Sequence, residues 1–186
     1  TATAAITDGL PQSGGVNLLP ANPLTSVGFS GGQFASGQGV NVSGMRFAQA
    51  LQVTTHTLAT NVWDIQLRWN NAAAIQANDT LFATFWLRNA DPTKPEANLH
   101  IVFEMNGDPW TKSAAHTVSV GTQWTRIDLP FRAVAGYAVN GAALSLRFGY
   151  PAQTVQIGGL SLTDSGGSVA APSLPQTQLS YPGHQG

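Results

Sequence analysis

Alternation of apolar and polar residues recurs along this chain and constrains its fold more than any other feature. In LHIVFEM, Leu99, Ile101 and Phe103 lie on one side of an extended chain, and His100 and Glu104 on the other. Short turn sequences such as NGDP separate the alternating runs. We expect strands at 47–55, 62–69, 81–88, 99–105, 115–120, 124–131, 143–149 and 154–162. This pattern predicts an all-β fold, a β-sandwich of jelly-roll type.

The last run changes its phase. Val155 and Ile157 share one parity, whereas Leu160 and Leu162 share the other. Both pairs can be buried only if an extra residue is inserted, and the glycine pair at 158–159 is where a β-bulge costs least. We expect the strand to kink there.

The composition excludes several classes of partner. Charged residues make up 9% of the chain, and the formal net charge is -1. A phosphate-binding surface needs a basic footprint, so we expect no nucleic acid and no anionic membrane as partner. The remaining surface must be rich in Ser, Thr, Asn, Gln and Gly, which suits neutral, hydroxyl-rich ligands.

The chain divides into one domain and two flanking segments. Residues 17–164 carry the strand pattern, and residues 1–16 are an N-terminal extension or a first edge strand. From position 165 to 186 the sequence SGGSVAAPSLPQTQLSYPGHQG has no alternation and has the composition of a Pro/Gly/Ser-rich linker.

Candidate binding residues come from the polar faces of the strands and from aromatic residues in loops. Flat aromatic rings stack on the apolar faces of sugars, and planar polar side chains bind vicinal hydroxyls. We expect the polar faces to form one sheet surface, on which Arg88 and Glu104 could instead form a satisfied ion pair. Trp63, Trp69 and Trp124 are expected in the core, and His100 is expected to be a satisfied surface or core residue. The candidate ligand-binding residues are Trp86, Arg88, Glu104, Trp110, Gln66, Asp64, Arg147, Tyr137 and Tyr150.

The order of segments resembles that of carbohydrate-binding modules of families 4 and 9, which are related to family 22. The resemblance rests on FAQALQV, NDTLFATFWLRN, LHIVFEMN, GTQWTRIDLPF, LSLRFGY and the closing IGGLSL, and it covers about residues 17–164. It implies a galactose-binding-domain-like jelly roll that binds a plant β-1,4-linked polysaccharide, xylan first and β-glucan second. It also implies that the kink in the closing strand lets this strand pass from the packing of one sheet to that of the other.

The tail extends the resemblance. PSLPQTQLSYPGHQG looks like the connector into the catalytic domain of a glycoside hydrolase family 10 xylanase. It implies a covalently linked catalytic domain in a longer, secreted bacterial protein, extracellular or periplasmic. Family members often carry an acidic calcium ligand at the position of Gly159, so we expect no cofactor here and leave a structural calcium open.

The sequence does not indicate an enzyme. No GxSxG, HExxH or P-loop motif occurs, and a glycosidase would need two carboxylates across the scissile bond. Only Glu104 and Asp64 could share a cleft. Two alternatives to a binding module remain: a catalytic jelly-roll hydrolase or lyase, and a structural accessory domain without glycan affinity.

Overall fold

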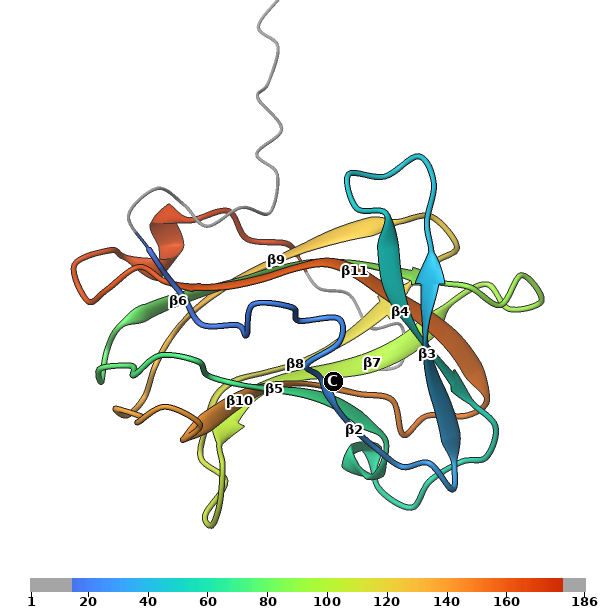
Figure 1. Cartoon of the computed structure of the whole chain (residues 1–186), viewed down its shortest axis with the longest axis horizontal. Helices are drawn as coiled ribbons and strands as arrows, with labels where there is room; N and C mark the ends of the chain where they lie inside the picture. The colour runs from blue at the N-terminus through green and yellow to red at the C-terminus, as the bar shows by residue number, and fades with distance from the viewer. Residues whose placement is uncertain (1–14, 179–186) are drawn as a thin grey trace, which may run out of the picture.

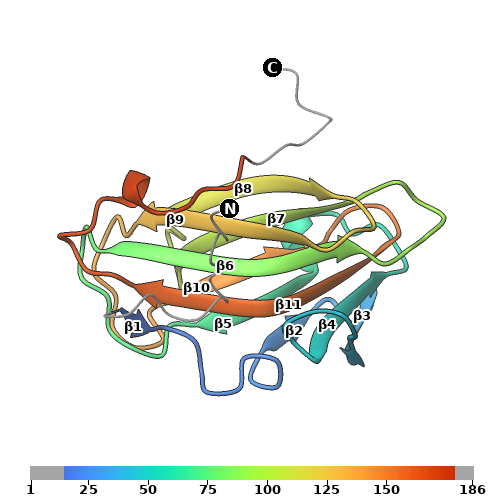
Figure 2. The ribbon, with the colours of Figure 1, turned by 90° about the horizontal axis from the view of Figure 1, so that it is seen from above.

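The computed structural model describes residues 15–178, which form two antiparallel β-sheets packed face to face (Figure 1). Sheet A has the order β3-β4-β11-β6-β9, with β1 beside the end of β11, and sheet B has the order β2-β5-β10-β7-β8. Figure 2 looks onto sheet A, where β11, β6 and β9 run side by side. The strands of sheet A are β1 (Val16–Asn17), β3 (Ala35–Asn41), β4 (Gln49–Thr55), β6 (Thr80–Asn89), β9 (Thr125–Arg132) and β11 (Gln153–Asp164). Those of sheet B are β2 (Gly28–Ser30), β5 (Gln66–Asn70), β7 (Ala97–Met105), β8 (Lys112–Val120) and β10 (Ala142–Arg147).

The core lies between the sheets and is built from the parities that the sequence predicts. Leu99, Ile101 and Phe103 of β7 are fully buried, and so are the inward residues of β6 and β10. Trp69 is also buried, and its indole N–H donates to the carbonyl of Pro23 at 2.7 Å. The all-β sandwich expected from alternation is therefore confirmed.

Strands β2 and β3 were not predicted, β1 lies at the end of the segment for which an edge strand was left open, and one predicted strand is too long. β3 has the sequence ASGQGVN, which shows no apolar alternation, and it is held by antiparallel pairing with β4 along its whole length. The run 62–69 was expected to be one strand. Instead, η1 (Val62–Asp64) is a 3-10 helix, and β5 begins only at Gln66.

The predicted bulge in the closing strand is present. On β11, Gly158 pairs with Trp86 and Ser161 pairs with Thr84, so two residues of β11 stand opposite Phe85 of β6. Val155, Ile157 and Leu162 are buried, and Leu160 is partly buried against the core. The expected passage of the strand between the sheets is wrong, because β11 pairs only within sheet A.

The glycine pair also makes room on the outer face of sheet A. A Cβ on Gly158 would lie 2.2 Å from the ring of Phe47. Gly159 has a φ of 59°, and its Cβ would lie 3.0 Å from Trp86. The bulge therefore corrects the phase of the strand and also seats two aromatic rings above it.

The first part of the expected linker packs on the sandwich. Thr80 bonds through its backbone with Ser165 and Gly166, and Thr177 exchanges two hydrogen bonds with Asp128 on the edge strand β9. This segment includes the 3-10 helix η2 (Ala171–Ser173). Residues 1–14 and 179–186 lie outside the described part, so the role of the tail as a connector stays a prediction. No helix in residues 15–178 is long and apolar enough to cross a membrane.

Candidate functional site

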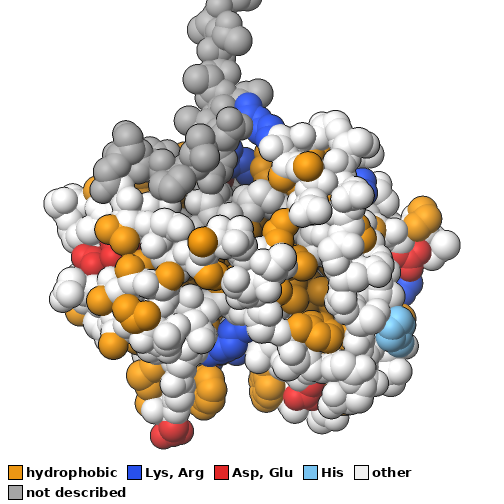
Figure 3. Space-filling model, in the orientation of Figure 1, with side chains coloured by type: hydrophobic (Ala, Val, Ile, Leu, Met, Phe, Trp, Pro, Cys, Tyr) orange, Lys and Arg blue, Asp and Glu red, His pale blue; other side chains and the backbone are white. Residues whose placement is uncertain are grey.

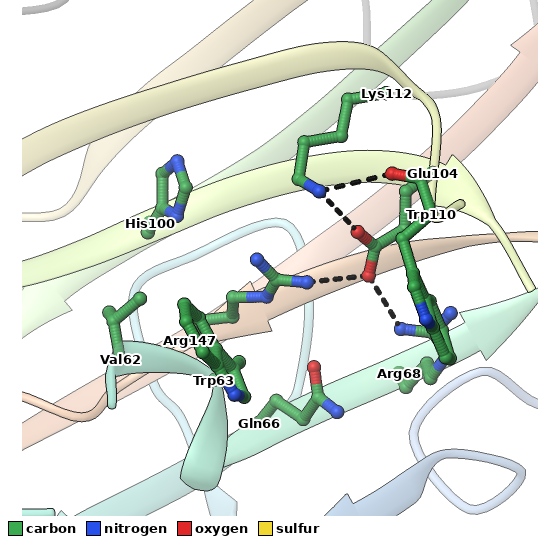
Figure 4. Close-up of a pocket in the computed structure, with 9 residues that line it drawn as sticks. All are labelled: Val62, Trp63, Gln66, Arg68, His100, Glu104, Trp110, Lys112 and Arg147. Atoms are coloured by element: carbon green, nitrogen blue, oxygen red, sulfur yellow. Dashed lines mark hydrogen bonds and ion pairs between the residues drawn. The ribbon is translucent and has the colours of Figure 1, made fainter. Parts of the chain in front are cut away.

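A pocket of about 780 Å³ opens on the outer face of sheet B. This volume is within the range of about 300–1,000 Å³ that is typical of small-molecule sites. Figure 3 shows a hollow at the lower edge of the molecule, with hydrophobic side chains on its sides and Lys or Arg side chains behind it. The lining residues, shown in Figure 4, are Val62, Trp63, Gln66, Arg68, His100, Glu104, Trp110, Lys112 and Arg147.

One buried carboxylate organises the floor of the pocket. The side chain of Glu104 is 1% exposed, and three cations surround it. Its Oε1 accepts from Arg147 at 2.5 Å and from Arg68 at 3.1 Å, while its Oε2 lies 3.0 Å from the Lys112 ammonium. The cations come from three neighbouring strands, so the cluster ties β5, β10 and β8 to β7.

The cluster determines the charge states in the pocket. Burial acts to raise the pKa of the Glu104 carboxyl, but hydrogen bonds from Lys112 and Arg68, helped by the charge of Arg147, outweigh burial and lower the pKa below its ordinary value. The pKa of His100 is lowered by burial and by the charges of Arg147 and Lys112. At neutral pH the pocket therefore holds an ionised Glu104 and a neutral His100.

Two tryptophans stand at opposite ends of this cluster. Trp63 is 52% exposed and Trp110 is 47% exposed. The guanidinium of Arg147 lies 6.0 Å from the ring centre of Trp63, and that of Arg68 lies 5.6 Å from the ring centre of Trp110. Each ring is thus placed by a cation–π contact and keeps about half of its surface open to solvent.

A close backbone approach positions Trp63. The Asn61 N–H donates to the Asp64 carboxylate at 2.8 Å, which closes the turn of η1. The N–H of Gly149 donates to the carbonyl of Val62, and a Cβ on Gly149 would lie 2.4 Å from the Asn61 oxygen. Only glycine fits at position 149 without displacing the segment that carries Trp63.

A tight hairpin between β7 and β8 positions Trp110. The backbone N–H of Trp110 donates to the carbonyl of Gly107 at 2.6 Å, and the φ angle of Trp110 is 56°. This left-handed conformation costs about 1–3 kcal/mol for a residue other than glycine. Asn106 anchors the base of the loop through bonds to Asn70 and to the carbonyl of Asn140.

Two polar side-chain atoms of the pocket lining have neither a hydrogen-bond partner nor an ion-pair partner among residues 15–178. They are Gln66 Oε1 and Arg147 Nε, and both are buried. Figure 4 places Gln66 between Trp63 and Trp110, below Arg147. An unsatisfied buried polar group costs free energy, so a hydrogen bond from a ligand hydroxyl or a water molecule to either atom would be stabilising.

The structure brings together four of the nine candidate residues, namely Gln66, Glu104, Trp110 and Arg147. The single sheet surface expected from the strand faces is wrong. Trp86 and Arg88 belong to β6 of sheet A, whereas the pocket lies on sheet B. Arg88 does not pair with Glu104. It donates to Gln156 at 2.8 Å, and its guanidinium lies 4.8 Å from the ring centre of Trp124.

The other three candidates lie outside the pocket lining. Tyr137 is 6% exposed and packs against Phe103 in the core, because its segment bridges to Ile75. Asp64 uses its carboxylate to hold the η1 turn, and Tyr150 follows β10. Tyr137 therefore lies in the core and not in the lining of this pocket.

Two tryptophans lie elsewhere than predicted, and neither Arg68 nor Lys112 was among the candidate residues. Trp63 was expected in the core because it is in phase with Ile65 in a continuous strand, and the helix η1 breaks that phase. The Asn-x-x-Asp spacing at 61–64 is a helix-start pattern that could have signalled the change. Trp124 is half-buried on the outer face of sheet A, where it packs edge-on against Phe47.

The position at which the resemblance would place a calcium ligand does not suit a metal ion in this chain. The space above Gly159 is taken by the rings of Trp86 and Phe47, and a glycine supplies no side-chain ligand. Residues 15–178 contain no group of three or more His, Cys, Asp or Glu side chains that could hold a metal ion.

No protein-family model matches the sequence, and no curated protein sequence matches it. Solved structures do match. A CBM4 module aligns with a TM-score of 0.60 at 14% identity, over 75% of this chain and 95% of that chain. The N-terminal cellulose-binding domain of β-1,4-glucanase C from Cellulomonas fimi aligns with a TM-score of 0.52 at 14% identity, over 69% and 88%.

A third match is part of a longer enzyme. The CBM22-1 and GH10 modules of the Clostridium thermocellum endo-1,4-β-D-xylanase 10B, complexed with xylohexaose, align with a TM-score of 0.58 at 12% identity, over 83% of this chain and 29% of that chain. The chain therefore has the β-sandwich fold of CBM4 and CBM22 modules, and the expected jelly-roll fold is confirmed.

Proposed function

We propose that the chain is a non-catalytic carbohydrate-binding module and that the pocket on sheet B is its glycan site. The observation that carries this proposal is the pair of half-exposed rings, Trp63 and Trp110, at the two ends of a polar floor. Planar rings stack on the apolar faces of pyranose sugars, and the floor supplies hydrogen-bonding groups for hydroxyls. Gln66 and Arg147 each offer a buried atom that lacks a partner in the described chain.

The proposed ligand is a plant β-1,4-linked glycan, with xylan first and β-glucan second. The proteins that share the fold support this choice, since one is a cellulose-binding domain and another is a xylanase complexed with xylohexaose. The pocket is open to solvent on sheet B, which suits a polymer better than a small enclosed metabolite.

We further propose that the module belongs to a longer, secreted bacterial protein and directs a covalently linked glycoside hydrolase, an endo-xylanase, to its substrate. The support is the connector-like tail and the similarity to a module that precedes a GH10 domain. The module itself contributes binding and no bond cleavage.

The pocket is poorly equipped for hydrolysis. A glycosidase needs two carboxylates about 5 Å or 6.5–9.5 Å apart. Glu104 is the one carboxylate that lines this pocket, and all three of its close contacts are cations. The arrangement holds Glu104 ionised, so it is no proton donor at neutral pH.

Affinity electrophoresis of the isolated chain against soluble xylan, mixed-linkage β-glucan and hydroxyethylcellulose tests the proposal. We expect retardation by at least one of these polymers and no release of reducing sugar. Retardation should be lost in Trp63→Ala and Trp110→Ala. Turnover by purified chain would favour the catalytic alternative, and absence of retardation by every polymer would favour a structural accessory domain.

A further inference from the structure

The pocket on sheet B concentrates positive charge in a chain that is otherwise nearly neutral. The whole sequence has eight Lys and Arg residues and nine Asp and Glu residues. Three of those eight cations line the pocket, together with one of the nine carboxylates. The lining therefore carries three positive charges and one negative charge, a net charge of +2, while the protein as a whole carries -1.

The one carboxylate cannot neutralise its three partners. Glu104 is the only acidic side chain within ion-pair distance of Arg68, Arg147 or Lys112 in residues 15–178. Asp64, four residues before Arg68, uses its carboxylate on the Asn61 backbone, and Asp108, four residues before Lys112, forms none of the ion pairs of these cations among the described residues. Burying cations without matching anions is costly, so the arrangement favours a ligand that brings negative charge.

The surroundings of Arg147 also favour a negatively charged ligand. Arg147 is 6% exposed, Nη2 is engaged with Glu104, and its Nε has no partner in the described chain. Figure 4 shows its guanidinium reaching toward the centre of the pocket, between Trp63 and Glu104. A planar guanidinium can bind a carboxylate through two parallel hydrogen bonds. The contacts with Glu104 show that these cations already bind one carboxylate.

Resting on the proposed function, we infer that the glycan bound in this pocket carries a carboxylate, as a uronic acid unit on or within a β-1,4-linked chain. The tryptophan rings stack on the sugars of the backbone, and the excess charge of Arg147, Arg68 and Lys112 binds the uronate. The charged unit adds affinity and selects acidic glycans over neutral chains of the same backbone.

Calorimetric titration with matched ligand pairs tests this inference. The first pair is a xylo-oligosaccharide with one glucuronic acid branch and the same compound with its carboxyl reduced to a hydroxymethyl group. The second pair is cellohexaose oxidised to a carboxylate at C6 of one unit and unmodified cellohexaose. At pH 7 and 0.05 M NaCl, we expect the acidic member of at least one pair to bind about tenfold more tightly. The ratio should fall at 0.5 M NaCl because salt screens the partly exposed cations.

Removing the charge of Lys112 tests whether the preference for acidic ligands arises in this pocket. Lys112→Met keeps most of the apolar stem, and Lys112 is 38% exposed, so the fold should persist. We expect it to lower the ratio of acidic to neutral affinity several-fold. Lys94→Met in the loop after β6 removes the same charge away from the pocket and should leave the ratio unchanged.

Each outcome decides between the two proposals. Equal affinity within both pairs overturns the inference and leaves the glycan-binding proposal intact. Binding to no member of either pair overturns both. Equally tight binding of a sulfated xylo-oligosaccharide overturns the assignment to a carboxylate, because the pocket would then recognise any anion. An equal effect of Lys94→Met and Lys112→Met places the effect in the overall charge of the protein and overturns the assignment to this pocket.

Discussion

The guanidinium of Arg147 lies 6.0 Å from the ring centre of Trp63. The two residues come from β10 and from the helix η1, and the same guanidinium bonds to Glu104 on β7. Arg147 therefore couples an exposed aromatic ring to the buried carboxylate of the pocket. This coupling makes the placement of the ring and the charge state of the floor testable by separate substitutions.

Removing either pocket tryptophan should reduce glycan affinity with little effect on folding. For Trp63→Ala and Trp110→Ala, we expect a loss of about 1–3 kcal/mol of binding free energy, roughly 10- to 100-fold, because the stacking surface disappears. The free energy of unfolding should change by about 1 kcal/mol or less, since both rings are half exposed. Trp86→Ala on sheet A is the control and should leave affinity unchanged. Loss of affinity only in Trp86→Ala would move the site to sheet A.

Adding one methyl group behind η1 should disturb Trp63 from a distance. In Gly149→Ala the new Cβ would lie 2.4 Å from the Asn61 oxygen and 2.6 Å from the Val62 Cα. We expect a loss of about 1–3 kcal/mol of unfolding free energy and a weaker binding of glycan. Gly39→Ala is the control, because its Cβ meets no atom within 4 Å. Thermal melts and titrations of the two variants check this, and equal behaviour would contradict it.

Alanine substitutions at the two glycines of the bulge should lower the free energy of unfolding for two different reasons. Gly158→Ala should lose about 1–3 kcal/mol of unfolding free energy because its Cβ meets the Phe47 ring, and the loss should shrink in a Phe47→Ala background. Gly159→Ala should keep a loss of about 1–2 kcal/mol in that background, because its φ of 59° is unfavourable for any residue with a Cβ. A double-mutant cycle from denaturant unfolding measures both. A Gly158→Ala loss that is the same with and without Phe47 would rule out the proposed clash.

Acidification should erase the stabilising role of Glu104. Its pKa in the folded chain lies below the ordinary value of 4.5, so its contribution is complete above that value and is lost as the pH falls through the folded-state pKa. At pH 7 we expect Glu104→Gln to be less stable than wild type by roughly 2–3 kcal/mol, allowing for the exposure of Arg68 and Lys112. Because Gln does not titrate, the difference should shrink toward pH 3.5. Denaturant unfolding at both values measures it, with Glu96→Gln as control, and a difference that grows on acidification would refute the assignment.

The fold was largely predictable because its main strands obey a local rule. Residues such as Ile101 and Leu146 show by their spacing which way they face, and the structure buries them as expected. The bulge at the glycine pair was readable for the same reason, since a change of phase within one strand is a local event. β3 was not readable, because its glycines and polar residues show no pattern and only pairing with β4 makes it a strand.

The site was only half predictable. Parity placed Gln66, Glu104 and Arg147 on outward faces, and a turn sequence placed Trp110 in a loop. Parity does not say which strands share a sheet, however, and it therefore joined Arg88 and Trp86 of sheet A to residues of sheet B. Parity also assigned Trp63 to the core. That assignment failed because the three residues of 3-10 helix before β5 change the direction of the Trp63 side chain.

The sequence by itself determined the class of the fold, the faces of its strands and the need for a bulge, because alternation and glycine conformations act between neighbours along the chain. The tertiary structure alone decided that Trp63 and Trp110 flank one pocket and that three cations gather on Glu104. The physical reason is that hydrogen-bonded pairing of distant strands chooses which outward faces meet, and that choice depends on how the two buried faces pack against each other.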